Sequence, residues 1–326
     1  MMNQPKVSVI IPVYKAEAFI ERCARSLFEQ TLDDMEYIFV NDCTPDKSIE
    51  IVKNVLGEYP HRQKQVHIIN HQNNLGVAQS REDGINKASG EYIIHCDSDD
   101  YVDLDMYEVM YLEGKEKNAE VVCCNYYAEY RTHKVLNKFP YKEETKQNMI
   151  LGISPIYGSL CNKLVKKSLF DENDLKFYED INMGEDLGLA TRFRFFSKKT
   201  IIVPKAFYHY TVQNNNSIFT NFTLEKNNDI IKCSSYLEKF FIKHNAVDQF
   251  HFQIEYLKFQ SKQYLLINKN IRDLNKWLSI FPETHTYIWE FKDSPFNIRL
   301  IAWLVSKKMN LVAKILLSLK DKYRKY

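Results

Sequence analysis

An acidic tetrad, Asp97-Ser98-Asp99-Asp100, directly follows a strand-like run at residues 91–96. Three carboxylates within four residues repel one another, and each loses hydration when it is buried. The end of a buried strand therefore suits them only if a cation or hydrogen-bond donors meet them there. Hard divalent cations such as Mg²⁺ and Mn²⁺ bind carboxylate oxygens and keep positions open for phosphate oxygens. The alternative is a helix cap, in which Asp99 or Asp100 precedes a helix that begins near Asp103.

The segment before the tetrad alternates between strand and helix patterns. Apolar, β-branched runs predict strands, and apolar residues at helical spacing predict helices between them. The strands are expected at residues 7–13, 35–40, 66–69 and 92–96, and the helices at 16–30, 46–58 and 77–88. This alternation predicts an α/β fold with a parallel, doubly wound sheet, whose ligands bind outside the carboxyl ends of the strands. Tyr14, Asp42 and the tetrad each follow a predicted strand, so we expect them to share one site.

The pattern changes along the second half of the chain. After the tetrad we expect a helix at 105–117, strands at 120–130, 134–139, 160–165 and 200–203, and a helix from Gly184-Glu185-Asp186 to about residue 196. Four helical stretches follow, at 223–245, 248–268, 270–280 and 296–320. The polar run at 213–217 predicts a boundary between an α/β domain at residues 1–220 and a helical C-terminal region at residues 221–326.

The composition argues against several classes of protein. The 326 residues are 45% hydrophobic with a net charge of +2, which predicts a large core and no nucleic-acid partner. The seven cysteines form no CxxC pair, which argues against a zinc site and against a secreted disulfide scaffold. The N-terminus does not resemble a signal peptide, and no apolar run approaches the ~20 residues of a membrane span. We therefore expect a cytoplasmic protein.

The chain lacks the glycine-rich loops GxxxxGK[ST] and GxGxxG, which hold phosphate groups in other nucleotide-binding proteins. A metal held by carboxylates is the alternative way to neutralise a diphosphate. The acidic tetrad could supply the ligands for that metal.

Five motifs over about residues 5–220 resemble, in order, those of family 2 glycosyltransferases with the GT-A fold. They are the opening strand at 7–14, the turn at 41–46, the segment at 74–84, the DxD-like tetrad at 97–100 and the late acidic motif at 184–186. Segments at 162–165 and 208–210, together with Ser217, are similar to bacterial members that build capsular and lipopolysaccharide chains. The resemblance implies a GT-A fold, which is a Rossmann-like, mostly parallel sheet, and a nucleotide-sugar donor.

The resemblance also implies a division of labour in the site. The residues expected around the donor are Pro12, Tyr14, Glu17, Asp42, Arg81, Asp97 and Ser98. Asp99 is expected to bind Mn²⁺ or Mg²⁺, with His209 as a second metal ligand or a phosphate donor. Asp100 is expected to serve local structure. The residues themselves leave alternatives open, because Asp42 could cap a turn and His209 could pack within an aromatic strand.

Asp186 is the expected general base, with Glu185 as the second candidate. An inverting transfer needs a carboxylate that takes the proton of the acceptor hydroxyl as that hydroxyl attacks C1 of the sugar. The alternative is that both residues begin a helix and complement its dipole. The two roles are compatible.

The predicted function is therefore inverting, metal-dependent transfer of a sugar from a UDP-linked donor to a saccharide or lipid-linked saccharide acceptor. Two alternatives differ in class. A sugar-nucleotide pyrophosphorylase would need a glycine- and arginine-rich loop after the first strand, which residues 12–16 do not provide. An inactive GT-A binding module would not need Asp99 and Asp186, which are both present.

The C-terminal tail is strongly basic. Residues 298–326 contain eight lysines and arginines against one aspartate, so they carry +7 and the remainder carries −5. On a helical wheel an apolar face collects residues 300, 301, 304, 311, 312, 315 and 319, with Lys308 inside it, which predicts a break near residues 306–310. Such a tail predicts either a helix packed on the catalytic domain or an interfacial helix at the inner face of the plasma membrane.

Overall fold

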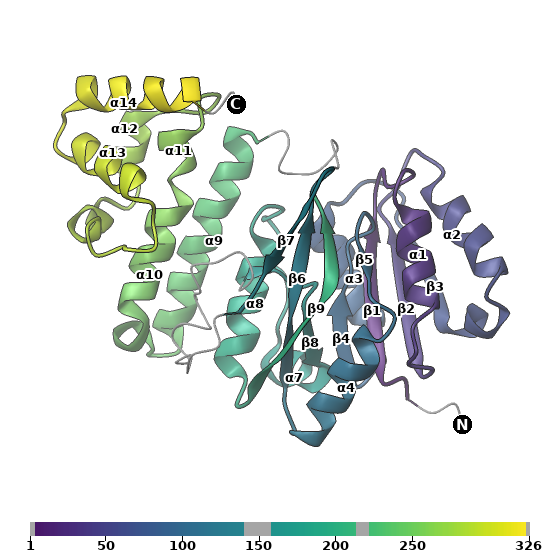
Figure 1. Ribbon diagram of the computed structural model, residues 1–326. Coiled ribbons are helices and arrows are strands. Elements are labelled where there is room, and N and C mark those ends of the chain that lie inside the picture. Colours follow the sequence, from purple (N-terminus) through teal and green to yellow (C-terminus); the bar gives the residue numbers. More distant parts are fainter. Residues whose placement is uncertain (1–3, 140–157, 213–221, 324–326) are drawn as a thin grey trace. The chain divides into compact units, whose positions relative to one another are not determined.

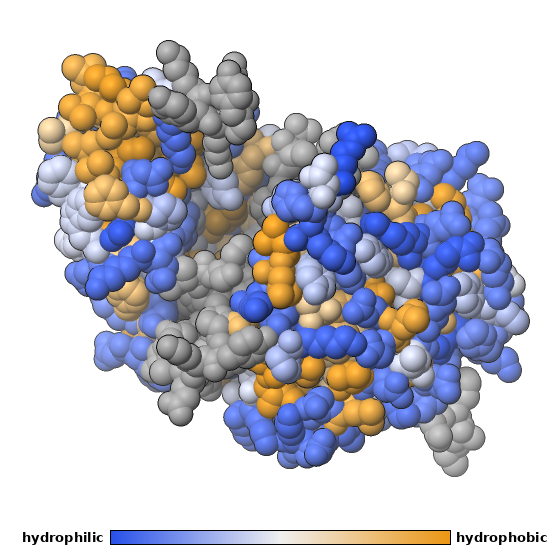
Figure 2. All heavy atoms as spheres, viewed as in Figure 1, coloured by the Kyte–Doolittle hydropathy of each residue, from blue (hydrophilic) through white to orange (hydrophobic). Residues whose placement is uncertain are grey.

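The chain, described here by a computed structural model, forms two compact units (Figure 1). The structure describes residues 4–139, 158–212 and 222–323. Of these, the first unit contains the residues up to 212 and the second contains those from 222 onward. The boundary predicted between residues 220 and 221 lies outside the described residues. Hydrophilic residues cover most of the face of the first unit that Figure 2 shows.

Four parallel strands form one half of the sheet, in the order β3-β2-β1-β4. They are β1 (Val7–Val13), β2 (Met35–Asn41), β3 (Val66–Asn70) and β4 (Tyr92–His95). The helical segments between them are α1 (Ile20–Phe28), α2 (Ser48–Gly57), η1 (Pro60–Gln65) and α3 (Val77–Lys87). The predicted strands and helices of this segment are confirmed, although α1 begins later than its pattern indicated. The carboxyl ends of β1, β2 and β4 lie at one edge of the sheet, as parallel pairing requires.

Alternate residues of β1 enter two separate cores, because successive side chains of a strand point to opposite faces. Val9 packs in the core that contains Leu27 of α1, whereas Ile10 packs in the core that contains Ile85 of α3. A Cβ atom at Gly84 of α3 would lie 2.3 Å from Ile10 Cγ2. Glycine at this position therefore allows α3 to lie close against β1.

The other half of the sheet is mixed. It contains β8 (Lys163–Lys166), β6 (Val121–Glu129), β9 (Thr200–Thr211), β5 (Tyr101–Val102) and β7 (Lys134–Asn137). Strand β8 runs antiparallel to β4 and β6, β9 runs parallel to β6, and β5 runs antiparallel to β9. The helices of this half are α4 (Met106–Glu116), α7 (Lys167–Asn173) and α8 (Glu185–Phe196). The whole arrangement confirms the predicted α/β class with a doubly wound, mostly parallel sheet.

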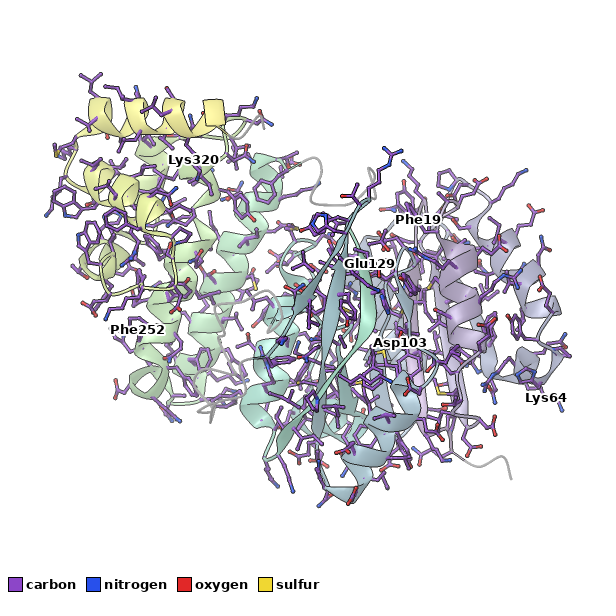
Figure 3. All side chains as sticks on the ribbon, viewed as in Figure 1. Phe19, Lys64, Asp103, Glu129, Phe252 and Lys320 are labelled. Carbon is purple, nitrogen blue, oxygen red and sulfur yellow. The ribbon has the colours of Figure 1, made fainter. Side chains whose placement is uncertain are left out.

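Two features of this half were not predicted. The sequence pattern indicated that this strand ends at Val203, because Pro204 and Lys205 interrupt the apolar run. In the structure β9 continues to Thr211. These two residues lie between the pairs Cys124–Val203 and Asn125–Ala206, so they bulge out of the ladder with β6. The short strand β5 follows the tetrad and is followed by Asp103, which is labelled with Glu129 in Figure 3.

The second unit is helical, as predicted. Its elements are α9 (Leu224–Lys243), α10 (Val247–Ser261), α11 (Tyr264–Ile267), α12 (Leu274–Ser279), η2 (Pro282–Tyr287), α13 (Phe296–Ser306) and α14 (Asn310–Tyr323). The core of this unit contains Trp277, Phe259 and Leu317. The predicted break in the last stretch is confirmed, since α13 and α14 are separated by a turn in which Lys308 has a φ of +60°.

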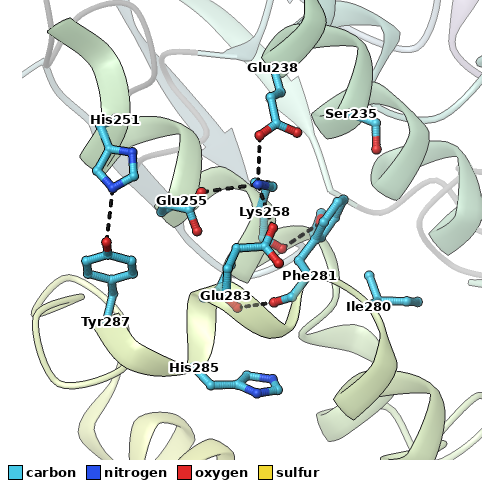
Figure 4. A network of polar contacts seen from close by, with 12 residues as sticks. Ser235, Glu238, His251, Glu255, Lys258, Ile280, Phe281, Glu283, His285 and Tyr287 are labelled. Atoms are coloured by element: carbon cyan, nitrogen blue, oxygen red, sulfur yellow. Dashed lines mark hydrogen bonds and ion pairs between the residues drawn. The ribbon is translucent and has the colours of Figure 1, made fainter. Parts of the chain in front are cut away.

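Lys258 joins three segments of the second unit through a network of ion pairs (Figure 4). Its Nζ lies 2.8 Å from Glu238 on α9, 3.1 Å from Glu255 on α10 and 2.6 Å from Glu283 on η2. Against the opposing effect of burial, these carboxylates raise the pKa of Lys258. The network therefore links α9, α10 and η2 by charge as well as by packing.

None of the described helices is both long enough and apolar enough to cross a lipid bilayer.

Candidate active site

Arg81 of α3 is the centre of a buried ion-pair cluster. Its Nη2 donates to Asp97 Oδ1 at 2.7 Å and its Nη1 donates to Glu185 Oε1 at 2.5 Å. The side chains of Arg81 and Glu185 are only 8% and 9% exposed. Burial lowers the pKa of Arg81, but Asp97 and Glu185 outweigh it and raise that pKa. The cluster brings the tetrad together with the late acidic motif, whose Glu185 lies 104 positions beyond Arg81.

The two candidate bases stand at the start of α8. The helix begins after Gly184, whose φ of +86° is the left-handed conformation that glycine adopts without strain. Glu185 is held by Arg81, and Asp186 Oδ1 accepts a hydrogen bond from the Leu187 N–H at 2.7 Å. Burial and the neighbouring Asp186 raise the pKa of Glu185 to about 8, although Arg81 opposes this. Burial also raises the pKa of Asp186, again against Arg81.

The tetrad divides into a site-facing part and a structural part. Asp97 pairs with Arg81 and remains 31% exposed, whereas Asp100 is fully buried. Asp100 accepts hydrogen bonds from the Tyr208 hydroxyl at 2.6 Å and from the Thr211 N–H at 2.7 Å. Burial, with Asp99 and Asp97 nearby, raises the pKa of Asp100. Asp100 therefore anchors β9 to the tetrad, which is the local role expected of it.

The carboxylate of Asp42 makes its contacts with nearby residues of the chain. Its Oδ1 accepts from the Leu75 N–H at 2.7 Å and contacts His71 Nδ1 at 2.9 Å, and its Oδ2 accepts from the Gly76 N–H at 2.9 Å. The residue is 3% exposed. Its contacts are those of the turn-holding alternative, because they fix the loop that leads into α3. A contact between Asp42 and a nucleobase stays a prediction.

The other expected donor-binding residues lie at or near the same edge of the sheet. Pro12 is in β1, and Tyr14 follows that strand with 43% of its surface exposed. The Glu17 N–H donates to Asp46 Oδ2 at 3.1 Å, which ties the β1–α1 loop to the β2–α2 loop. Ser98, within the tetrad, is buried. Tyr14 and Glu17 are thus the two exposed residues of these four.

The ring of His209 lies between two carboxylates. Its Nδ1 lies 2.7 Å from Glu129 Oε1 and its Nε2 lies 3.0 Å from Asp103 Oδ1, the two carboxylates labelled in Figure 3. Both ring nitrogens are therefore engaged. The preceding residue, Tyr208, contacts the tetrad, and successive strand residues point to opposite faces. Binding of a metal by His209 stays a prediction, which would require the ring to release one of these carboxylates.

A cavity of about 540 Å³ lies beside His209 on the first unit. It is lined by Asp103, Asn125, Tyr127, Lys134, Leu136, Lys138, Pro204, Lys205, Ala206 and His209. None of Arg81, Asp97, Glu185 and Asp186 lines it, so the cavity is distinct from the ion-pair cluster. Its lysines carry the opposite charge to the tetrad.

Sequence reasoning missed two residues that shape the site. The Tyr208 hydroxyl accepts from the Asp97 N–H at 3.1 Å, besides donating to Asp100. Arg22 of α1 donates to the Asp99 carbonyl at 3.3 Å and lies over the Tyr101 ring, 4.2 Å from its centroid. The aromatic run at 208–210 was a signal for the tyrosine. No signal in the sequence pairs Arg22 with the tetrad.

The donor set fits a hard divalent cation. Asp97 and Asp99 are both partly exposed, and Arg81 reaches Asp97. Among the described residues, no three His, Cys, Asp or Glu side chains converge in a ready-made metal site. Mg²⁺ typically uses one or two carboxylates and completes its shell with phosphate oxygens and water. The residues present therefore fit a cation that binds together with a phosphate-bearing ligand.

Comparisons with solved structures agree with this fold. S. aureus TarS 1–349, solved in complex with UDP-GlcNAc, superposes with a TM-score of 0.71 at 17% identity and covers 98% of this chain and 92% of that one. The mannosyltransferase PcManGT from Pyrobaculum calidifontis, solved with GDP-Man and Mn²⁺, gives a TM-score of 0.57 at 14% identity, over 100% and 89% of the two chains.

Sequence comparison identifies the family. The uncharacterized glycosyltransferase EpsJ of Bacillus subtilis is 36% identical over 193 residues, which are 56% of this chain. The chain spans 54% of the length of EpsJ. The family model described as Glycosyl transferase family 2 matches residues 8–173, which include β1, the Asp42 turn, Arg81 and the tetrad. The chain therefore belongs to glycosyltransferase family 2.

Proposed function

We propose that this chain is an inverting, metal-dependent glycosyltransferase. It moves a sugar from a nucleotide-sugar donor, a UDP-sugar in the first instance, to a hydroxyl of a saccharide or lipid-linked saccharide in surface polysaccharide synthesis. The observation that carries the proposal is the Arg81 cluster, because it holds Asp97 and Glu185 in one buried network. One cation therefore joins the proposed donor-binding carboxylate to the motif that contains the proposed base.

The donor end of the site consists of Asp97, Asp99 and Arg81. Asp97 accepts hydrogen bonds from the ribose hydroxyls with the carboxylate oxygen that Arg81 leaves available. Asp99 holds Mn²⁺ or Mg²⁺, which, when bound, supplies positive charge beside the leaving diphosphate. The UDP-GlcNAc complex of TarS and the Mn²⁺ complex of PcManGT support this choice of donor and ion.

Asp186 is the proposed general base. The acceptor oxygen forms a bond to C1 of the sugar on the face opposite the diphosphate, while the C1–oxygen bond to the diphosphate breaks and its electrons leave with the nucleotide. The hydroxyl proton passes to the Asp186 carboxylate. A raised pKa makes the ionised carboxylate a stronger base, and general bases typically contribute ~10²–10⁴-fold to a rate. Glu185 is less suited to this task, because Arg81 engages its carboxylate.

The test is a panel of nucleotide-sugars screened against the full chain by thermal shift, with and without Mn²⁺. A ligand that binds only the folded state raises apparent stability. We expect stabilisation by UDP or a UDP-sugar that requires Mn²⁺, followed by release of UDP when an acceptor is supplied. Binding of a donor without any transfer or hydrolysis would favour the inactive binding module instead. An absence of any nucleotide-dependent shift would reject the proposal.

A further inference from the structure

Helix α14 has an apolar face on each side. Ala313 and Leu317 are fully buried in the core of the second unit. On the opposite side four apolar residues are exposed. Leu311, Val312, Ile315 and Leu319 have 76%, 42%, 54% and 47% of their surface accessible. Leu311, Ile315 and Leu319 stand at i, i+4 and i+8, so they form one stripe along the outer face of the helix.

The exposed apolar stripe differs from the apolar face that the helical wheel predicts. The predicted wheel joined residues of α13 and α14 in a single apolar face. In the structure Ile301 and Leu304 of α13 are buried in the core, 2% and 5% exposed, whereas the α14 stripe is outside it. The turn at Lys308 separates the two helices and allows them to use their apolar residues differently.

Isolated exposed apolar residues are common on soluble proteins, but contiguous patches mark interaction surfaces. Met309, just before α14, is a further exposed apolar residue at 44%. Figure 2 shows hydrophobic residues gathered over α13 and α14, in contrast to the hydrophilic face of the first unit. The stripe is therefore part of a patch rather than a single exposed side chain.

Basic residues border the stripe. Lys307, Lys308 and Lys314 are exposed, and Lys308 and Lys314 are three and one residues from members of the stripe. The acidic residue of α14, Asp321, pairs with Arg272 at 3.0 Å, so its charge is already compensated within the second unit. The surroundings of the stripe thus combine apolar side chains with positive charge.

We propose that α14 binds the surface of an anionic lipid bilayer. The helix axis lies in the plane of the membrane, and the apolar stripe lies among the acyl chains. Neither the apolar stripe nor the lysines alone would indicate an anionic bilayer. A polyanion in solution would contact the lysines but not the apolar stripe. An apolar protein surface would contact the stripe but not the lysines. An anionic bilayer surface uses both. The inference goes beyond the transfer reaction and does not depend on it.

The experiment is co-sedimentation of the full chain with vesicles of phosphatidylcholine alone, or mixed with phosphatidylglycerol. We expect binding to the mixed vesicles and at least tenfold weaker binding of a Leu311→Asn, Ile315→Asn double variant. Ile242→Asn is the matched control, because Ile242 lies on α9 of the same unit and is 58% exposed. It should bind as the unchanged chain does. All three residues are exposed, and circular dichroism verifies that each variant folds.

The charge contribution has its own measurement. Lys308→Gln and Lys314→Gln should each weaken binding to the mixed vesicles about fivefold at low salt, and the loss should shrink as salt rises. Failure of the full chain to bind mixed vesicles would overturn the proposal. So would equal binding by the double variant. A dimer in light scattering that dissociates in the double variant, without vesicle binding, would show that a second copy covers the stripe instead.

Discussion

Arg81 holds Asp97 with one nitrogen and Glu185 with another, at 2.7 Å and 2.5 Å. The first partner lies two residues after the end of β4, and the second begins helix α8, 104 positions away from Arg81. The guanidinium therefore links the acidic tetrad to the helix that carries the candidate base Asp186. It also lowers the pKa of Glu185 and of Asp186, and so favours their ionised forms.

Removal of the Arg81 charge should move the pH dependence of transfer. Arg81 lowers the pKa of both Glu185 and Asp186, so an Arg81→Gln variant should need a higher pH to ionise its base. The rising limb of kcat/KM against pH should shift to the alkaline side. Arg81→Lys, which keeps the charge, should shift it less. An unchanged limb, or one moved toward acid, would contradict the role given to Arg81.

The stability of these variants needs a separate check. Breaking a buried ion pair by removing one partner costs about 3–5 kcal/mol. Thermal unfolding should therefore be measured beside the pH profile. Arg25→Gln is the matched control, because Arg25 makes two ion pairs on the surface with Glu21 and Glu58. It should alter neither the profile nor the melting temperature appreciably.

Replacing the base should separate binding from chemistry. Asp186→Asn keeps an oxygen that can accept the Leu187 N–H, so the start of α8 should remain intact. Donor binding, measured by calorimetry with UDP and Mn²⁺, should be retained, while the rate of transfer should fall by ~10²–10⁴-fold. Glu185→Gln is the comparison variant for the second candidate base. If Asp186→Asn instead loses donor binding, or only Glu185→Gln stops transfer, the assignment is wrong.

The metal role of Asp99 should appear in a Mn²⁺ titration. Asp99→Asn removes a negatively charged ligand, so Mn²⁺ should no longer strengthen UDP binding and metal-dependent turnover should be lost. Asp105→Asn is the control, because Asp105 is a nearby carboxylate that pairs with Lys205 at 2.6 Å outside the tetrad. If turnover by the Asp99→Asn variant responds normally to Mn²⁺, Asp99 is not a metal ligand.

The second unit offers a stability prediction. Lys258→Met would leave Glu238, Glu255 and Glu283 without their shared cation, and such a loss typically costs about 3–5 kcal/mol. The three tryptophans, Trp277, Trp289 and Trp303, all belong to this unit, so tryptophan fluorescence follows its unfolding.

The matched control for this change is Lys243→Met, which alters an exposed lysine of α9. Its unfolding midpoint should differ little from that of the unchanged chain. Equal midpoints for the Lys258 and Lys243 variants would show that the network contributes nothing measurable.

Lys262 should make the stability of the second unit depend on pH. Burial lowers the pKa of Lys262 from 10.5 to about 7, so between these values the unfolded chain binds more protons than the folded one. Unfolding free energy should therefore rise with pH through this window. Lys262→Gln, which cannot titrate but can still donate to the Ile280 and Phe281 carbonyls, should flatten that rise. A slope between pH 7 and 9 that is equal in both proteins would refute this.

Local sequence patterns determined the elements and the edge at which the site lies. The apolar runs that became β1, β2 and β4 each end in polar residues, and parallel pairing brings those ends together whatever the rest of the chain does. The role of Asp100 in local structure and the break near Lys308 could be predicted for the same reason. Each depends on the backbone and on neighbours a few residues away.

Contacts between distant segments decided the rest. The sequence could not show that Asp42 is used by the Leu75–Gly76 loop, that His209 faces Glu129 and Asp103, or that Arg81 reaches Glu185. A side chain takes the partners that folding brings to it, and periodicity carries no information about which these are. The apolar residues of α13 and α14 look alike in sequence. Only the packing of the second unit buried one set and left the other on the surface.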